Sequence, residues 1–502
     1  MTEERAEESA QESAQESAED KTRDEPTKKV WVKPTITALH SGTMNKFGAM
    51  RHEQWRDNID GVLIKDLLEK FGSPLFVISE KRLRENARRL QRSFKARYPH
   101  VLFGWSYKTN YLGAVCNVFH QEGACAEVVS AFEYQRARSL GVPGHCILFN
   151  GPHKSREILE QAVTEGAHIH IDHLDELYLL EDVAHEAGKE VAVTIRLNFD
   201  TGYTEPWSRF GFNVESGQAM DVVWRICSSR FLKLTGLHSH IGTFITEPEA
   251  YRVQVRIMCG FMQAVEQKTQ REIEYLDIGG GFASLNSLQG TYLPAEQVVP
   301  SIEQYAEAVC DTLLELTHER VAQGRNRPTL VLETGRAMVD DAEVLISSVV
   351  ANKHLPDGRR GVVMDAGVNL LFTAFWYNHE VTPTRQLSGK PEETVLYGPL
   401  CMNIDVLRNS IMIPPLNVGD ALVMSPVGAY NNTQWLQFIE YRPNVVMVGA
   451  KGKVSLVRAK ENLEAVIAQE QLPAHLQSAY PEGAPGNLFS KDAFLKKERK
   501  GE

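Results

Sequence analysis

Eight short β-rich runs alternate with amphipathic helical stretches between about residues 80 and 335, and this alternation constrains the fold more than any other feature. The helical stretches between the runs include residues 154–165, 174–187 and 300–323. Eight strands that alternate with helices are typical of a parallel (β/α)8 TIM barrel. The predicted strands are residues 101–107, 126–130, 146–150, 168–172, 191–197, 234–240, 273–278 and 329–333.

The sequence changes character on both sides of this barrel, which we assign to residues 80–336. Short β-rich segments separated by Gly, Pro and Asp follow it and predict a C-terminal all-β domain over residues 337–460. Residues 30–79 end in the strand-like PLFVIS and are expected to contribute to that β domain. Residues 1–29 repeat an acidic ESAQ unit and predict a disordered tail. Residues 461–502 predict a C-terminal helix and a polar tail.

Composition excludes several classes of protein. Of 502 residues, 24% are charged and 43% hydrophobic, which is ordinary for a globular chain. The net charge of −11 argues against binding to nucleic acid or an anionic membrane surface. No apolar run reaches the roughly 18–20 residues of a membrane span, and the first thirty residues lack a signal-peptide core. Seven scattered cysteines without a CxxC pair fit a reducing cytoplasm.

Polar side chains gather where the predicted strands end. In a (β/α)8 barrel the active site lies at the carboxyl ends of the strands, so these residues test the fold prediction. A purely structural barrel would not need so many chemically capable groups there. The sequence therefore predicts an active site at this end of the barrel. The groups are Lys108, Glu127, Ser130, Asn150, Asp172, Arg196, His238, His240, Asp277, Glu333 and Arg336.

Taken singly, most of these groups also fit a structural role. Lys108 could extend its amine to solvent, or it could be a desolvated amine that forms a Schiff base. Glu333 and Arg336 fit a buried ion pair as well as a pair of functional groups. The glycines at 279–281 fit a turn, or a backbone that approaches a phosphate closely. Their spacing matches neither a dinucleotide fingerprint nor a Walker loop.

The histidines allow a metal site to be considered. His238 and His240 are two residues apart and share one face of their strand, and the HIHIDH segment adds three more histidines at 168, 170 and 173. None of them has a convincing third ligand in the sequence, so we expect no metal. An imidazole that stacks on a flat cofactor is the preferred interpretation of His240.

The combination of motifs is far more specific than any one of them. Over residues 45–460 the chain resembles the pyridoxal-phosphate enzymes of the alanine-racemase-like barrel fold, in particular the diaminopimelate and ornithine decarboxylases. The resemblance rests on YKTN at Lys108, AEVVSAFEY at 126–134, SRFGF at 208–212, HSHIGT at 238–243, LDIGGGF at 276–282, ETGR at 333–336, DAGVN at 365–369, GPLCMNID at 398–405 and GAY at 428–430.

This resemblance implies a cofactor, a set of roles and a partner. Pyridoxal 5'-phosphate would be bound as a Schiff base by Lys108, with His240 stacked on its ring and Glu333 facing the ring nitrogen. Cys401 would come from the neighbouring subunit of a homodimer and protonate the substrate carbon. The other residues implied to bind the cofactor are Glu127, Ser130, Thr243, Gly279, Gly280, Gly281, Gly335, Arg336 and Tyr430.

The expected partner is a small-molecule amino-acid substrate, and the sequence departs from the family at the residues that would select this substrate. Met402 stands in place of an acidic residue that holds a distal amine, and Thr373 stands in place of an arginine that binds a distal carboxylate. Tyr377 and Asp405 match the family, and Arg209 could replace the missing arginine.

These departures predict an α-decarboxylase with an altered substrate. That substrate would be an amino acid of the ornithine or lysine type, in the L or the D form, or a larger conjugated amino acid. Three alternatives stay open: a genuine meso-diaminopimelate decarboxylase of lysine biosynthesis, an amino-acid racemase, and a catalytically silent regulatory homologue. Cys401 in its GPLC setting favours decarboxylation over racemisation.

Overall fold

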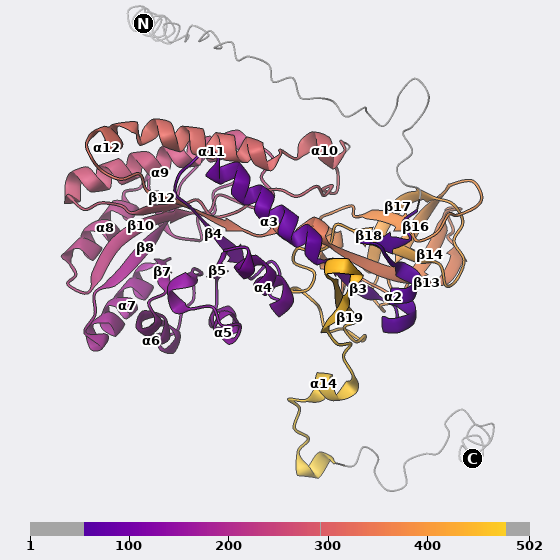
Figure 1. Ribbon diagram of the computed structural model, residues 1–502. Coiled ribbons are helices and arrows are strands. Elements are labelled where there is room, and N and C mark those ends of the chain that lie inside the picture. Colours follow the sequence, from indigo (N-terminus) through magenta and orange to yellow (C-terminus); the bar gives the residue numbers. More distant parts are fainter. Residues whose placement is uncertain (1–54, 292, 478–502) are drawn as a thin grey trace, which may run out of the picture. The chain divides into compact units, whose positions relative to one another are not determined.

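The structure is a computed structural model that describes residues 55–291 and 293–477, and eight of its strands close into a parallel barrel (Figure 1). Each strand pairs in parallel with the next, and the last returns to the first through Leu330 beside Val101. The predicted TIM barrel is therefore confirmed. Its strands are β4 (Val101–Ser106), β5 (Cys125–Val128), β6 (Ile147–Phe149), β7 (His168–Ile171), β8 (Val191–Asn198), β10 (Leu232–Ser239), β11 (Tyr275–Asp277) and β12 (Thr329–Thr334).

Amphipathic helices alternate with these strands, and α3 (Glu80–Lys95), which precedes β4, shows why they form. Ser79 caps its first turn by accepting the Arg82 N–H, and its buried positions recur every three or four residues, at Leu83, Ala87, Leu90 and Phe94. Among the described helices, none has the length and apolar character that a membrane crossing requires. The others around the barrel are α4 (Gly113–Gln121), α5 (Ala131–Ser139), α6 (Arg156–Glu165), α7 (Leu174–Ala187), α8 (Gln218–Ser228), α9 (Pro248–Thr269), α11 (Ile302–Leu316) and α12 (His318–Ala322).

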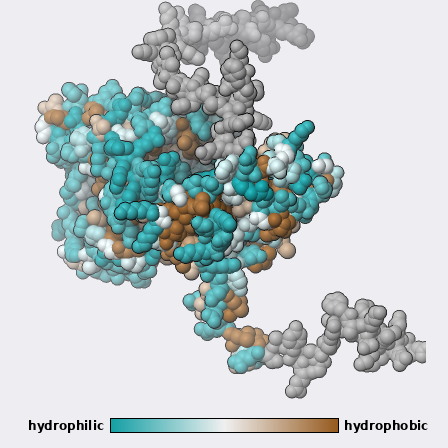
Figure 2. Space-filling view, turned by 45° about the vertical axis from the view of Figure 1, so that its right-hand side comes forward, coloured by the Kyte–Doolittle hydropathy of each residue, from teal (hydrophilic) through white to brown (hydrophobic). Residues whose placement is uncertain are grey.

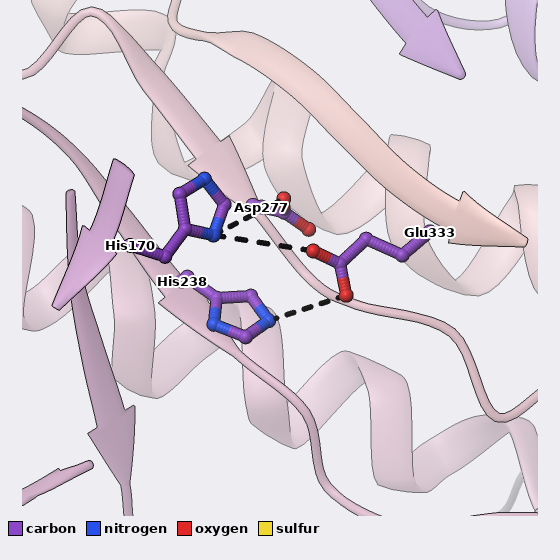
Figure 3. A group of neighbouring side chains, drawn as sticks. All are labelled: His170, His238, Asp277 and Glu333. Atoms are coloured by element: carbon purple, nitrogen blue, oxygen red, sulfur yellow. Dashed lines mark ion pairs between the residues drawn. The ribbon is translucent and has the colours of Figure 1, made fainter. Parts of the chain in front are cut away.

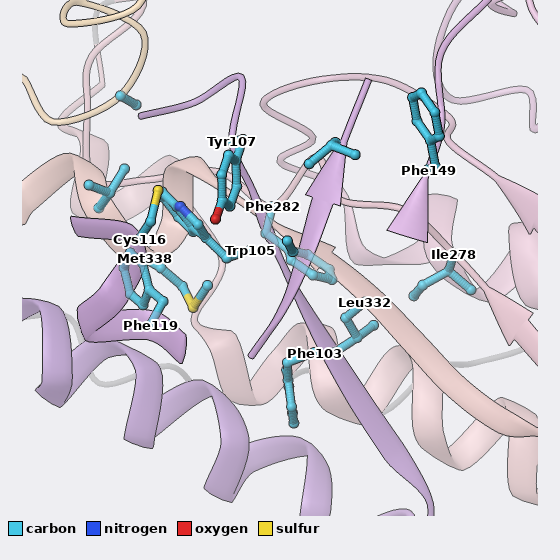
Figure 4. Close-up of a cluster of buried hydrophobic side chains, with 14 of the residues drawn as sticks. Phe103, Trp105, Tyr107, Cys116, Phe119, Phe149, Ile278, Phe282, Leu332 and Met338 are labelled. Atoms are coloured by element: carbon cyan, nitrogen blue, oxygen red, sulfur yellow. The ribbon is translucent and has the colours of Figure 1, made fainter. Parts of the chain in front are cut away.

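A cluster of large apolar side chains fixes β4, the strand that leads to Lys108 (Figure 4). The Trp105 and Phe119 rings lie 4.1 Å apart between centroids, and both side chains are fully buried. Met338 and Cys116 lie in the same cluster. Such packing stabilises a core by several kcal/mol per aromatic side chain, so the end of β4 is held rigidly.

A second sheet lies outside the barrel and confirms the all-β part of the predicted fold. Its strands run in the order β17 (Val406–Ile413), β16 (Glu392–Tyr397), β14 (Arg360–Met364), β13 (Glu343–His354), β3 (Leu75–Ser79), β19 (Asn444–Val448) and β20 (Val454–Arg458). Strand β18 (Ala421–Ser425) pairs with β13 and with β15 (Glu380–Pro383).

Strand β3 precedes the barrel in sequence, yet it lies between β13, which runs antiparallel to it, and β19, which runs parallel. Helix α2 (Ile64–Phe71) also comes before the barrel, and α14 (Leu463–Ile467) follows the last strand. The residue limits given above for each domain stay predictions. The predicted tails, residues 1–29 and the end of 461–502, fall wholly or partly outside the described residues.

The segment after β4 is tied to the β domain. The Asn110 side chain donates to Glu343 Oε2 at 3.2 Å and to the Gly428 carbonyl at 3.1 Å. The Tyr430 N–H donates to the Thr109 carbonyl at 2.8 Å. These bonds bring Tyr430 to the carboxyl ends of the barrel strands, beside the candidate site.

Candidate active site

A cavity of about 590 Å³ opens at the carboxyl ends of the barrel strands. Its volume falls in the range of small-molecule sites, roughly 300–1,000 Å³. Much of the site proposed from the sequence lines it. The predicted residues that do so are Lys108, Glu127, His240, Thr243, Gly280, Gly281, Glu333, Gly335, Arg336, Tyr377 and Tyr430.

Lys108 lies two residues beyond the end of β4 and is held by Glu127. Its Nζ lies 2.9 Å and 2.8 Å from the two carboxylate oxygens of that residue, which is fully buried in β5. Loss of solvation lowers the pKa of Lys108, but the charges of Glu127 and Glu333 more than offset this, so the pKa lies above its ordinary value. The amine is thus fixed at the cavity and must lose a proton before it can attack a carbonyl carbon.

His240 forms one wall of the cavity. Its Nδ1 accepts the Gly280 N–H at 3.1 Å, and the edge of its ring meets Trp207, with centroids 5.1 Å apart. Burial, followed by the charge of Lys108, lowers its pKa to about 3. The imidazole is therefore neutral and held in one orientation, as a ring that stacks on a flat ligand should be.

The glycine run after β11 is required by close packing under this histidine. Gly279 has a φ of 68°, and a Cβ on it would lie 2.6 Å from His240 Nδ1. A Cβ on Gly280 would lie 2.3 Å from the Glu333 carbonyl oxygen. Gly280 and Gly281 line the cavity, whereas Gly279 does not, and its N–H donates to Asp277. Part of the run thus serves packing rather than a ligand.

Arg336 lies among three aromatic rings at the cavity wall. Its guanidinium carbon is 4.8 Å from the Tyr377 ring centroid, 4.9 Å from that of Tyr430 and 5.8 Å from that of Phe244. Its buried Nε and Nη1 have no hydrogen-bond partner, and Asp340 is 3.7 Å away. A buried guanidinium with unused N–H groups suits an anion such as a phosphate.

Glu333, at the end of β12, accepts a hydrogen bond from Asn150 and lies 3.4 Å from His238 Nε2. Burial raises its pKa, but the charge of Lys108, together with the Asn150 hydrogen bond, outweighs this and leaves the pKa below its ordinary value. The carboxylate is therefore ionised and can hold a protonated ring nitrogen. Lysine, ionised glutamate, stacking imidazole and unpaired arginine together fit a pyridoxal-type cofactor.

Four of the predicted site residues have other partners and do not line the cavity. Ser130 caps α5 by accepting the Glu133 N–H. Thr373 is buried and bonds to His379 and Asn431. Asp405 accepts the N–H groups of Val368 and Leu400. Arg209 is exposed, with its guanidinium 4.7 Å from the Phe210 ring centroid.

Cys401 and Met402 also lie away from the cavity of the single chain. Both are in the loop between β16 and β17, where Cys401 is exposed and Met402 is partly buried. Their predicted roles depend on a second subunit and stay predictions.

Some cavity residues were not recognised from the sequence. Phe244, Leu288 and Gln434 line the cavity from loops and carry no motif signal. Leu288 reaches it because the Gln289 N–H donates to the Trp376 carbonyl at 2.7 Å, which joins two distant loops. Only the position of Phe244, directly after the HSHIGT motif, could have indicated its place.

A closed (β/α)8 barrel whose strand ends combine these groups defines the class of barrel enzymes that hold a pyridoxal cofactor. The chain belongs to the pyridoxal-dependent decarboxylase family, because the profile of that family's pyridoxal-binding domain matches residues 82–340. Its cofactor is pyridoxal phosphate, and it is a carboxy-lyase. This favours decarboxylation over the racemase and silent-homologue alternatives.

Several relatives are similar along most of their length. The diaminopimelate decarboxylases of Methanothermobacter thermautotrophicus and Methanocaldococcus jannaschii are each 29% identical to this chain, over 83% of it and 96% and 95% of their own lengths. The crystal structure of the M. jannaschii diaminopimelate decarboxylase is 28% identical, with a TM-score of 0.75, and the match covers 84% of this chain and 96% of that one.

Proposed function

We propose that this chain is a pyridoxal-phosphate-dependent α-decarboxylase whose preferred substrate is not meso-diaminopimelate. The preferred substrate would be a basic amino acid such as ornithine or lysine, in the L or the D form, or a larger conjugated amino acid. Family membership supports amino-acid decarboxylation. The observation that carries the altered substrate is Thr373, which has no charge and is buried outside the cavity, where the family resemblance places an arginine.

Among the described residues that line the cavity, the cationic ones are Lys108, Arg196 and Arg336. Lys108 is paired with Glu127, and Arg196 lies 3.6 Å from Asp172. Arg336 is the one suited to the cofactor's phosphate. A distal carboxylate on the substrate would thus lack a cation in this chain, at a loss of about 1.5–3 kcal/mol or roughly 10–200-fold in specificity.

The wall contributed by loops supports a substrate with an apolar stem. Phe244, Leu288 and Trp376 all line the cavity. Apolar surface favours methylene groups, and an exposed indole can attract an ammonium group through its π face. Both interactions suit a basic amino acid better than a second carboxylate.

Each residue then has a proposed task. Bound pyridoxal phosphate supplies an electron sink for the electron pair left when CO₂ departs. Lys108 holds the cofactor covalently, His240 covers one face of its ring, and Glu333 keeps the ring nitrogen protonated. Arg336 and Tyr430 hold the phosphate, with backbone from the glycine run.

We also propose that the active enzyme is a homodimer in which Cys401 of one subunit protonates the substrate carbon in the other. Its exposed position outside the single-chain cavity supports this. Apolar side chains gather near the middle of the face seen in Figure 2, and the described chain exposes large apolar residues such as Trp376 and Ile404. Large exposed apolar surfaces mark interfaces.

A cytoplasmic location stays part of the proposal. All seven cysteines lie among the described residues and are unpaired. Free thiols persist in reducing compartments, which supports the location without identifying it.

Genuine meso-diaminopimelate decarboxylase is the second candidate, and the names of the relatives favour it. Arg209 offers a route to it, because its neighbour Phe210 lines the cavity. A modest loop movement would turn the exposed guanidinium inward and supply the missing cation.

Steady-state kinetics on a panel of amino acids tests the proposal. CO₂ release would be measured with meso-diaminopimelate and the L and D forms of ornithine and lysine, with the Lys108→Ala variant as the inactive control. We expect meso-diaminopimelate to have a kcat/KM at least about 10-fold below the best substrate. If it has the highest kcat/KM of the panel, the argument from Thr373 is wrong.

A further inference from the structure

Four buried side chains from four barrel strands meet beside the cavity (Figure 3). They are His170 of β7, His238 of β10, Asp277 of β11 and Glu333 at the end of β12. Their side chains are at most 4% exposed. One nitrogen or oxygen from each lies within 4.8 Å of the others. We call these four residues the buried quartet.

Hydrogen bonds within the quartet are incomplete. Asp277 Oδ1 accepts the Gly279 N–H at 2.9 Å, and Glu333 accepts from Asn150. Asp277 Oδ2 and both ring nitrogens of each histidine have no partner. Unpaired buried polar atoms are costly, so small shifts that join them are favoured.

His170 occupies the position that joins the two carboxyl groups. Its Nδ1 lies 4.0 Å from Asp277 Oδ2 and 3.9 Å from a Glu333 oxygen, at nearly equal distances from the two carboxyl groups. Movement of less than about 1 Å would make either contact a hydrogen bond. His238 Nε2, at 3.4 Å, faces the other Glu333 oxygen.

Two buried carboxyl groups this close cannot both be ionised. Burial and the charge of Glu333 raise the pKa of Asp277 well above its ordinary value, whereas the pKa of Glu333 is lowered. Burial lowers the pKa of both quartet histidines well below the ordinary value, so both are neutral. The other charged or titratable groups that face the quartet are Lys108, Glu127, Lys154, His168, Arg196, His240 and Tyr275.

We propose that His170 is a positioning residue for Glu333: it accepts a hydrogen bond from the protonated Asp277 carboxyl group and so keeps Glu333 ionised toward the cavity. In this arrangement Asp277 Oδ2–H donates to His170 Nδ1, and His238 Nε2–H donates to Glu333. Glu333 is the competing acceptor, because its carboxylate lies within hydrogen-bond reach of Asp277, and without His170 it would accept the Asp277 proton alone. The inference rests on the proposed function, because it gives the ionised Glu333 its task at the cofactor ring.

The first test compares the pH dependence of kcat for the holoenzyme and its His170→Leu variant, with the best substrate of the panel. We expect kcat of His170→Leu to fall about 10-fold or more on the acid side and to recover as pH rises and Glu333 ionises, with KM changed less than threefold. His170→Asn, whose side-chain oxygen can replace Nδ1 as acceptor, should restore the original profile.

His168→Leu is the matched control, since it removes an imidazole from the same strand two residues away. It should keep the wild-type profile. An unchanged profile in His170→Leu, or an equal change in His168→Leu, would overturn the proposal.

Infrared spectroscopy of the holoenzyme tests the inference without any turnover. In difference spectra against the wild type, Asp277→Asn should lose one protonated-carboxyl band while that of the buried Glu343 remains, and Glu333→Gln should lose none. In His170→Leu part of the Asp277 band should shift, because Glu333 then shares the proton, and adding Glu333→Gln should remove the shifted part. Loss of the band in Glu333→Gln alone would overturn the inference, as would stoichiometric binding of Zn²⁺ that is abolished in His170→Leu. A protein that decarboxylates nothing in the panel but passes this test would contradict only the proposed function.

Discussion

At the scale of single residues, Arg336 carries a testable consequence of its unpaired N–H groups. Arg336→Lys keeps the charge but loses the planar fork that binds a phosphate through two hydrogen bonds. We expect roughly 10- to 100-fold weaker binding of pyridoxal phosphate to the cofactor-free protein, against less than about threefold for pyridoxal, which lacks the phosphate. Spectroscopic titration with both compounds measures the difference.

The same substitution at Arg256, an exposed arginine paired with Glu249, is the matched control and should change neither affinity. An equal loss of both compounds in Arg336→Lys would mean that Arg336 supports the cavity wall rather than the phosphate.

At the scale of elements, the start of β13 holds a buried acid at the junction with the barrel. Glu343 is fully buried and accepts hydrogen bonds from the Asn110 and Asn432 side chains. Burial raises its pKa to about 8. The folded chain therefore binds this proton more tightly than the unfolded chain. As a result, Glu343 lowers the free energy of unfolding as pH rises from about 4.5 to 8.

Glu343→Gln removes this pH dependence, because glutamine resembles the protonated acid at every pH. The unpaired Asn432 Oδ1 can accept from the new amide if the Asn432 amide turns over. The melting temperature of the variant relative to that of the wild type should rise by about 2 °C or more between roughly pH 6 and pH 9. The exposed Glu464→Gln should show no such trend; a parallel fall in wild type and Glu343→Gln would refute the assignment.

Local sequence patterns predicted single elements well. The helix predicted at 174–187 is α7, and the strand predicted at 101–107 is β4. The long helix predicted at 300–323 is instead broken at Thr317, whose hydroxyl donates to the Leu313 carbonyl. Pairing of β3 with β13 and β19 could not be read locally, because its partners are far along the chain.

The same distinction applies to the candidate site. Lys108, Glu127 and Glu333 lie at or just beyond the carboxyl ends of strands, so the fold prediction placed them. Leu288 and Trp376 meet only through loop packing, which no short-range pattern records. His170 alternates with the core residues Ile169 and Ile171 along its strand and shares a face with His168, and only the closed barrel brings it to Glu333.

At the scale of the whole molecule, subunit mixing tests whether the site is shared. Lys108→Ala and Cys401→Ala proteins, each inactive, should regain activity when their subunits exchange. Random pairing gives half heterodimers with one intact site each, or about a quarter of wild-type activity. Lys108→Ala mixed with Glu333→Gln should not recover, because both changes lie in the same cavity. With exchange verified, no recovery in the first mixture would mean that each site is contained within one chain.

Strand β3 also sets an order of events during synthesis of the chain. Its residues leave the ribosome before the barrel does, but their β13 partners follow roughly 265 residues later. At a synthesis rate of about 5–20 residues per second, this apolar strand remains unpaired with β13 for roughly 10–50 s. The five residues of LFVIS are fully or almost fully buried in the finished sheet. A nascent chain of this kind is therefore a natural client for a holding chaperone until β13 is synthesised, directly after the last barrel strand.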